Sequence, residues 1–196
     1  MRQPVRLLAV LALAFGLAGC GVNDIPTYEE QAKANWAQVQ NQYQRRADLI
    51  PNLVETVKGY AAQERETLEA VVKARAAANQ TTLSPEMLND PAAFQKFQEA
   101  QGQLGSALSR LMVVVERYPD LKSAENFRQL QTQLEGTENR IAVARRDYIE
   151  AVRLYNTELV TLPGRIWASL LYSEKQQMQT FTTAPENATV PSVKFN

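Results

Sequence analysis

The sequence contains no histidine and a single cysteine among its 196 residues. Histidine is the usual general base near neutral pH and the commonest ligand of transition metals. Its absence excludes Ser-His and Cys-His nucleophile pairs, zinc-protease motifs and the Glu-x-x-His di-iron sites of helical bundles. One cysteine cannot form a disulfide within the chain or a cysteine-based zinc site. We therefore expect no metal site, no cofactor and no enzymatic activity.

The chain also lacks an excess of charge of either sign. Lys and Arg together number 21, as do Asp and Glu, so the formal net charge is +0. A general nucleic-acid binder would carry a basic excess, so we expect no nucleic-acid partner. With 45% hydrophobic residues, a chain of this length suits one domain with a sizeable core.

The apolar run near the amino terminus is too short to span a bilayer. It covers residues 7–17, behind Arg2 and Arg6, whereas a membrane-spanning helix needs about 20 apolar residues. This arrangement indicates a signal peptide. The run leads into the sequence Leu-Ala-Gly-Cys at residues 17–20, which resembles the lipobox of bacterial lipoproteins. The resemblance implies cleavage after residue 19 and acylation of Cys20, with palmitate among its lipids. The alternatives are an ordinary signal peptide with an unrelated cysteine and an uncleaved anchor.

Loss of residues 1–19 would change the charge and set the location of the protein. Arg2 and Arg6 are removed with no acidic residue, which leaves 19 basic and 21 acidic residues and a net charge of −2. Such a domain gains no electrostatic hold on anionic lipid headgroups. In lipoproteins of double-membraned bacteria an aspartate after the cysteine commonly signals inner-membrane retention, and this chain has Gly21 there. We expect a lipid-anchored protein outside the cytoplasm, at the periplasmic face of the outer membrane if the host has two membranes.

The rest of the chain has the periodicity of amphipathic helices. From Tyr28 onward apolar residues recur every three or four positions, and no segment alternates as a half-buried strand would. Asn89 or Asp90 can cap one helix, with Pro91 in its first turn. The predicted helical segments are 27–79, 91–118, 120–161 and a shorter one from about 164 to 178.

Pro51 interrupts the first of these segments. Proline lacks a backbone donor and clashes with the preceding helical turn. One alternative is a long helix with a kink, and the other is two helices that meet at 48–50, with Asp48 as the cap of the second. The apolar stripe keeps its phase across the proline, which favours a kink or a tight break near Asp48–Pro51.

Four helical segments with short connections predict an all-α fold, an elongated antiparallel four-helix bundle with long helices. The predicted organisation is a lipoprotein signal peptide over 1–19, a lipid-anchored tether over 20–27, a helical bundle over 28–181 and an extended C-terminal tail over 182–196.

Two long segments resemble the LemA family. The first is QYQRRADLIPNLVETVKGYAAQERETLEAVVKARAAA, at 42–78, and the second is AENFRQLQTQLEGTENRIAVARRDYIEAVRLYNTELVTLPGRIWA, at 124–168, with a weaker match at 191–195. The resemblance implies an elongated antiparallel four-helix bundle at a bacterial membrane, mostly outside the cytoplasm, with no catalytic residues to carry over. Many relatives look anchored by an amino-terminal transmembrane helix, whereas this chain carries a lipobox.

Several polar residues stand where the helical stripe requires apolar ones. They include Arg46, Glu64, Thr137 and Glu138, while Asp147 lies beside the stripe. Buried charges are costly unless they are paired. We therefore predict that Arg46 meets a carboxylate of a neighbouring helix, Glu138 or Asp147, and that the pairing fixes helix register. The alternative places these charges on the solvated rim, with their stems over the core.

These features favour a scaffold over an enzyme. Carboxylates such as Glu64 and Glu138 could perform acid–base chemistry, but the scattered glycines match no phosphate-binding pattern and no nucleophile accompanies them. The leading interpretation is a scaffold or modulator that contacts unidentified envelope proteins. The alternative is a module that binds a lipid or small apolar ligand, in a pocket where the short fourth segment fails to cover the long ones.

Overall fold

A computed structural model describes residues 21–81 and 84–181 of the chain. The regular elements of these residues are all helices, and no strand occurs among them, which confirms the predicted all-α class. Cys20, the predicted signal peptide and the predicted tail over 182–196 lie outside the described residues. The elements are α2 (Asp24–Tyr60), α3 (Arg65–Gln80), the 3-10 turn η1 (Pro85–Met87), α4 (Pro91–Val115), α5 (Pro119–Ser123), α6 (Glu125–Val160) and α7 (Gly164–Leu171).

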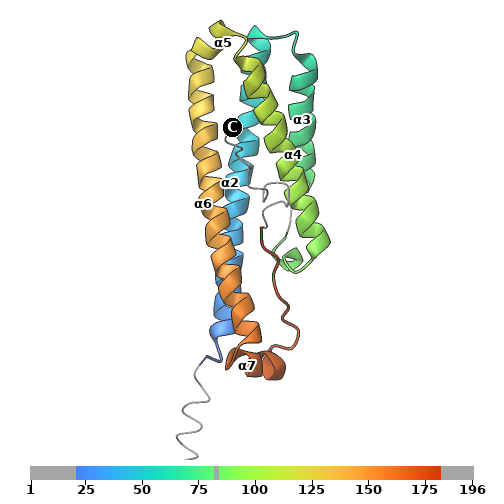
Figure 1. The fold of residues 1–196 in the computed structure, drawn as a ribbon, viewed down its shortest axis with the longest axis vertical. Coiled ribbons are helices and arrows are strands. Elements are labelled where there is room, and N and C mark those ends of the chain that lie inside the picture. The colour runs from blue at the N-terminus through green and yellow to red at the C-terminus, as the bar shows by residue number, and fades with distance from the viewer. Residues whose placement is uncertain (1–20, 82–83, 182–196) are drawn as a thin grey trace, which may run out of the picture.

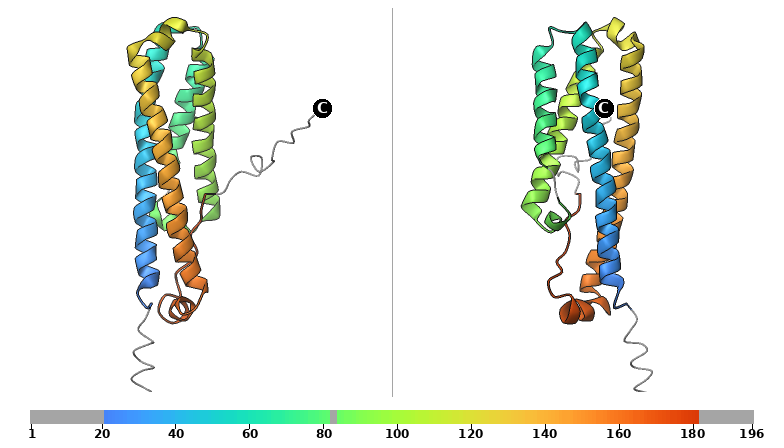
Figure 2. Two further views of the ribbon diagram at one scale, coloured as in Figure 1. Left: turned by 60° about the vertical axis from the view of Figure 1, so that its left-hand side comes forward. Right: turned by 180° about the vertical axis from the view of Figure 1, so that it is seen from behind.

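Two helices extend along the whole molecule and two others cover part of them. α2 and α6, with 37 and 36 residues, lie side by side and run in opposite directions (Figure 1). α3 and α4 pack on each other beside one end of this pair, and the short α5 joins α4 to α6 at that end (Figures 1 and 2). α7 lies at the other end, next to the beginning of α2.

The chain reverses after Tyr60, not at Asp48–Pro51. α2 continues through Pro51, so the alternative of two helices meeting at 48–50 is wrong. A single helical segment over 27–79 is also wrong, because α2 ends at Tyr60 and α3 begins at Arg65. The turn at 61–64 contains neither glycine nor proline. It is closed by bonds from the Ala61 N–H to the Val57 carbonyl and from the Glu64 N–H to the Ala61 carbonyl. Because the usual turn residues are missing, the periodicity of apolar residues did not predict this turn.

The first helix begins earlier than residue 28. Asp24 is its first residue, so residues 24–27, expected within the tether, form its first turn. Pro26 is compatible with this position, because the first N–H groups of a helix have no partner within the helix. Ile25 is fully buried, which explains why the helix is held down from its start.

The last helix ends at Leu171, and the predicted continuation to about Met178 is wrong. Residues 172–181, which we call the strap, run back along the molecule as an irregular segment (Figure 1). Met178 and Phe181 are buried. Met178 is therefore buried as part of an irregular segment, and its spacing from the preceding apolar residues does not mark a helical face.

Side-chain and backbone hydrogen bonds hold the strap in place. The Asn156 amide on α6 donates to the Met178 carbonyl and accepts from the Met178 N–H, each over 2.9 Å. The Gln179 N–H donates to the Leu88 carbonyl at 2.8 Å. The Tyr148 hydroxyl donates to the Gln179 carbonyl at 2.8 Å. The strap is thus fixed to α6 and to the segment before α4.

The buried apolar side chains form two clusters along the molecule. The aromatic cluster contains Trp36, Tyr43, Phe94, Phe97, Tyr148, Tyr155 and Phe181 with smaller apolar neighbours, including Ile141. The aliphatic cluster is built mainly from Ile50, Leu53, Val57, Leu68, Val71, Leu104, Leu108, Leu111 and Leu134, with Phe127. The core therefore consists of two clusters that follow one another along the long axis. The polar groups described next lie between them.

Candidate functional site: a polar layer between two apolar clusters

Polar side chains separate the two clusters on three different helices. Arg46 lies between Tyr43 and Ile50 on α2, Gln101 lies between Phe97 and Leu104 on α4, and Thr137 lies between Leu134 and Ile141 on α6. Each is three or four positions from its apolar neighbours and so lies on the same helix face. We call Arg46, Gln101, Thr137 and Glu138 the polar layer.

Arg46 connects the three helices of this layer. Its Nη1 lies 3.1 Å from Oε1 of Glu138 on α6, and its Nη2 donates to Oε1 of Gln101 on α4 over 2.5 Å. The guanidinium also stacks on Tyr43, 4.9 Å from the ring centroid. The Arg46 side chain is 5% exposed and that of Glu138 is 45% exposed. A buried cation is thus paired with a carboxylate that still contacts solvent. Within the polar layer, the Arg46 Nε is buried without a hydrogen-bond partner.

The structure separates the other predicted site residues from this layer. Asp147 is bonded to its neighbour Arg146, and its backbone carbonyl accepts from Asn35. Glu64 lies at the turn before α3, where it accepts from the Tyr118 hydroxyl at 2.7 Å and pairs with Arg117 at 3.0 Å. Of the two carboxylates proposed for Arg46, the structure therefore brings only Glu138 to it.

Sequence reasoning missed two residues that act in this region. Gln101 is visible in the sequence as the single polar exception in the apolar stripe of α4. That exception marks the position, but its role as an acceptor for Arg46 depends on the packing of α2 against α4. Arg75, on α3, donates from Nε to the Ala47 carbonyl over 2.7 Å. The available signal was Pro51, which leaves the carbonyl four residues earlier without its helical donor.

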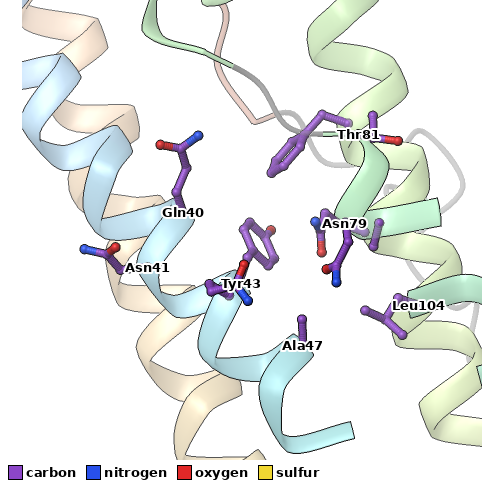
Figure 3. Close-up of a pocket in the computed structure, with 11 residues that line it drawn as sticks. Gln40, Asn41, Tyr43, Ala47, Asn79, Thr81 and Leu104 are labelled. Atoms are coloured by element: carbon purple, nitrogen blue, oxygen red, sulfur yellow. The ribbon is translucent and has the colours of Figure 1, made fainter. Parts of the chain in front are cut away.

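A cavity of about 310 Å³ opens beside the polar layer (Figure 3). It is lined by side chains of α2, α3 and α4 and of Thr81, the residue that follows α3. Its polar lining consists mostly of amides, from Gln40, Asn41, Gln44, Asn79 and Gln101. None of the lining residues is acidic or basic, so this cavity offers hydrogen bonds but no group for acid–base chemistry at neutral pH.

The buried tyrosine hydroxyls are also unsuited to proton transfer at neutral pH. Burial raises the pKa of Tyr155 to about 12 and raises that of Tyr148 well above its usual range. Burial likewise raises the pKa of Tyr43, although Arg145 and Arg46 oppose this effect. Within residues 21–81 and 84–181, no group of three His, Cys, Asp or Glu side chains could hold a metal ion. The three tyrosines belong to the aromatic cluster, and the buried Arg46 pairs with Glu138.

Residues 35–195 match the LemA family. The chain belongs to the LemA family. The match includes the polar layer and the strap, and it confirms the resemblance seen in the segments 42–78 and 124–168.

The LemA-family chain is also similar to three magnetosome proteins. They are MamQ 1 and MamQ 2 of Paramagnetospirillum magneticum (strain ATCC 700264 / AMB-1) and MamQ of Magnetospirillum gryphiswaldense (strain DSM 6361 / JCM 21280 / NBRC 15271 / MSR-1). Each is 29% identical over 183 residues, and the alignments cover 83% of this chain and 67% of each relative. Among the helices described for this LemA-family member, none has the length and apolar character needed to cross a membrane.

Proposed function

We propose that this LemA-family chain is a membrane-anchored, non-enzymatic protein of the cell envelope that acts as a scaffold or modulator through protein–protein contacts. Lipids on Cys20 hold it at the membrane, and Gly21 favours the periplasmic face of the outer membrane in a host with two membranes. In this proposal α2, α3, α4 and α6 form an elongated antiparallel bundle in which α2 bends at Pro51. Membership of the LemA family and the similarity to magnetosome proteins support a place at a membrane.

The packing of the aromatic cluster is the observation that carries this proposal. The Trp36 ring lies 5.2 Å from Phe97, 5.1 Å from Tyr148 and 6.1 Å from Phe181 between centroids. Phe181, on the strap, thus packs among aromatic residues of α2, α4 and α6. A lipid or small apolar ligand would need an apolar cavity among these helices. Aromatic side chains pack around Trp36, and the polar lining of the cavity beside the polar layer consists mostly of amides. This packing favours protein contacts over the alternative of ligand binding.

The surface between α2 and α6 suits contact with another protein. A cavity of about 350 Å³ lies along these helices, lined by residues of both, including Asn35, Gln42 and Arg140. Val143, an exposed apolar side chain, also lines it. Shallow surfaces of this mixed composition are typical of protein interfaces, which combine apolar contacts with polar rims.

In-cell photo-crosslinking tests the proposed contacts. A photoreactive amino acid is placed at Val143, with a matched control at Val72, a similarly exposed position on α3. We expect discrete crosslinked proteins from membranes with the probe at 143 and a different or weaker pattern at 72. If neither these positions nor a scan of the exposed faces of α2 and α6 captures a protein, the scaffold function is contradicted. Recovery of a stoichiometric lipid with the purified protein would instead favour the alternative.

A separate experiment tests the anchor. The Cys20→Ser chain is expected to leave the membrane fraction, and mass spectrometry of the wild-type protein is expected to show an acylated chain that begins at residue 20. Separation of the two membranes by density is expected to place the protein in the outer one. A wild-type protein that carries no acyl group at residue 20 would contradict lipid anchoring without bearing on the crosslinks.

A further inference from the structure

Exposed apolar side chains gather at the end of the molecule where α6 meets α7. Five large apolar residues lie within 12 consecutive positions, and we call them the apolar end-face: Val160 (53% exposed), Leu162 (73%), Ile166 (47%), Leu170 (69%) and Leu171 (57%). Single exposed apolar side chains are normal, but clustered ones on a soluble surface mark a contact with a protein or a membrane. Arg165 is the only charged residue between positions 160 and 171.

The exposure of this face follows from firm docking of α7 by its other side. Trp167 and Ala168 pack against the aromatic cluster, and Gly164 is buried. A side chain at Gly164 would overlap the Glu158 carbonyl oxygen, so the close approach of α7 to α6 requires glycine there. With these residues turned inward, Ile166 and Leu170 are held outward.

The first described residues lie at the same end of the molecule as this face. Gly21 lies at Pro163, so close that a Cβ on it would be 3.4 Å from the proline Cγ. The Tyr172 hydroxyl, immediately after α7, donates to the Val22 carbonyl at 3.1 Å. α7 and the start of α2 accordingly share one end of the molecule in each view (Figures 1 and 2). Residue 20 is therefore one peptide unit from a residue that contacts the α6–α7 turn.

We infer that the apolar end-face inserts into the surface of the lipid bilayer that anchors Cys20. This inference rests on the proposed lipid anchor, which brings the residue next to Gly21 to the membrane surface. The apolar side of an interfacial helix typically enters the boundary between headgroups and acyl chains by about 5–10 Å. Arg165 can extend its charged end to the headgroups while its stem stays among the apolar side chains. The long axis of α2 and α6 then points away from the membrane.

Apolar contact is the interaction that orients the protein in this arrangement. The chain without residues 1–19 is mildly acidic, and acidic protein gains no attraction from an anionic leaflet. A lipid anchor alone leaves a domain free to rotate about its attachment. Insertion of Leu162, Ile166 and Leu170 supplies the additional contacts that fix the bundle upright.

Site-specific fluorescence in vesicles tests this inference with the full-length acylated protein. A cysteine replaces Leu170 and, in the control, Val113, which is 71% exposed on α4. Acylated Cys20 has no free thiol, so an environment-sensitive fluorophore labels only the new cysteine. The proteins are reconstituted into vesicles of phosphatidylethanolamine and phosphatidylglycerol, with or without brominated acyl chains. We expect a blue shift and loss of emission in brominated vesicles at 170, and neither change at 113.

The other outcomes separate this inference from the proposed anchor. If the protein floats with the vesicles while the probe at 170 stays in water, the inserted end-face is wrong and the anchor stands. A blue shift at 170 without quenching by brominated lipid would show that a second copy or another protein covers the face, which also overturns insertion. Failure of the wild-type chain to float with vesicles would overturn both. Circular dichroism of the labelled proteins checks that the exposed substitutions preserve the helices.

Discussion

The Nε of Arg75 on α3 donates a hydrogen bond to the backbone carbonyl of Ala47 on α2, at 2.7 Å. In an uninterrupted helix that carbonyl would accept from the N–H of residue 51. Position 51 is a proline and has no N–H to donate. A side chain from the neighbouring helix thus supplies the missing donor, and a partly buried carbonyl keeps its partner. This contact explains how α2 continues through Pro51 to Tyr60.

We predict that Arg75→Met lowers the free energy of unfolding by about 1–3 kcal/mol, because it leaves the Ala47 carbonyl without a donor. Urea unfolding of the full-length protein, followed by circular dichroism, measures the loss. Lys73→Met, at an exposed position of the same helix, is the control and is expected to change stability by less than about 0.5 kcal/mol.

The role of Pro51 can be separated from other effects by a double-mutant cycle. Pro51→Ala restores a backbone N–H that can bond to the Ala47 carbonyl, so Arg75→Met is expected to cost less in that background. Equal losses with and without the proline would show that Arg75 stabilises the protein through some other contact.

The second prediction concerns the asymmetry of the polar layer. Arg46→Met is expected to destabilise the protein by about 1–3 kcal/mol, because it removes the donor to the Gln101 amide and to Glu138. Glu138→Gln is expected to cost less than about 1 kcal/mol, since that side chain is half exposed and its loss is screened by solvent. Thermal unfolding of both variants measures the difference.

Arg45→Met is the matched control, because Arg45 is the exposed neighbour of Arg46 on α2. A change in the packing of α2 against α6, detected by distance measurements between labels on the two helices, would indicate that the pair fixes register. Unchanged stability and packing in Arg46→Met would contradict that role.

The third prediction is a dependence of stability on pH through Glu29. Burial acts to raise the pKa of Glu29, but hydrogen bonds from Lys175 and Lys33 more than offset it and hold the pKa below the usual 4.5. A lowered carboxyl pKa contributes stability that is present above the unfolded-state value and is lost as pH falls through the folded-state value. Lys175 belongs to the strap and lies 2.8 Å from the Glu29 carboxylate.

Glu29→Gln is therefore expected to cost about 1–2 kcal/mol at neutral pH and progressively less below pH 4.5. Denaturant unfolding between neutral and acid pH measures this convergence. Glu30→Gln, at the exposed adjacent position, is expected to leave the acid dependence close to that of the wild type. A Glu29→Gln curve parallel to the wild-type curve would contradict the assignment.

The fourth prediction concerns the attachment of the strap. Asn156→Ala removes both of the side-chain bonds to Met178 and is expected to cost about 1–3 kcal/mol. In the variant, the Met178 and Gln179 amides are expected to exchange hydrogen faster than in the wild type, with a smaller change at the amides of α2. Asn139→Ala, at an exposed position of the same helix, is the control. Unchanged exchange in the strap would show that apolar burial alone holds it.

Features that depend on a few adjacent residues could be predicted from the sequence. Asp90 caps α4 by accepting from the Ala92 and Ala93 N–H groups, and Pro91 is the first residue of that helix, as the capping pattern predicts. Arg46 and Gln101 could be picked out as polar exceptions for the same reason, because the helical period needs only neighbouring positions. The choice of Glu138 over Asp147 depends on the relative height of α2 and α6, which no local pattern contains.

The helical class and the polar positions within the apolar stripes could be predicted from the sequence, because helix periodicity and capping depend on residues close in the chain. The turn at 61–64 and the irregular strap became visible only in the folded molecule. The turn has no glycine or proline to mark it, and the strap is held by bonds to α6 and to Leu88, far from it in sequence. Such long-range contacts also decide that α7 turns Trp167 inward and leaves its other apolar side chains exposed.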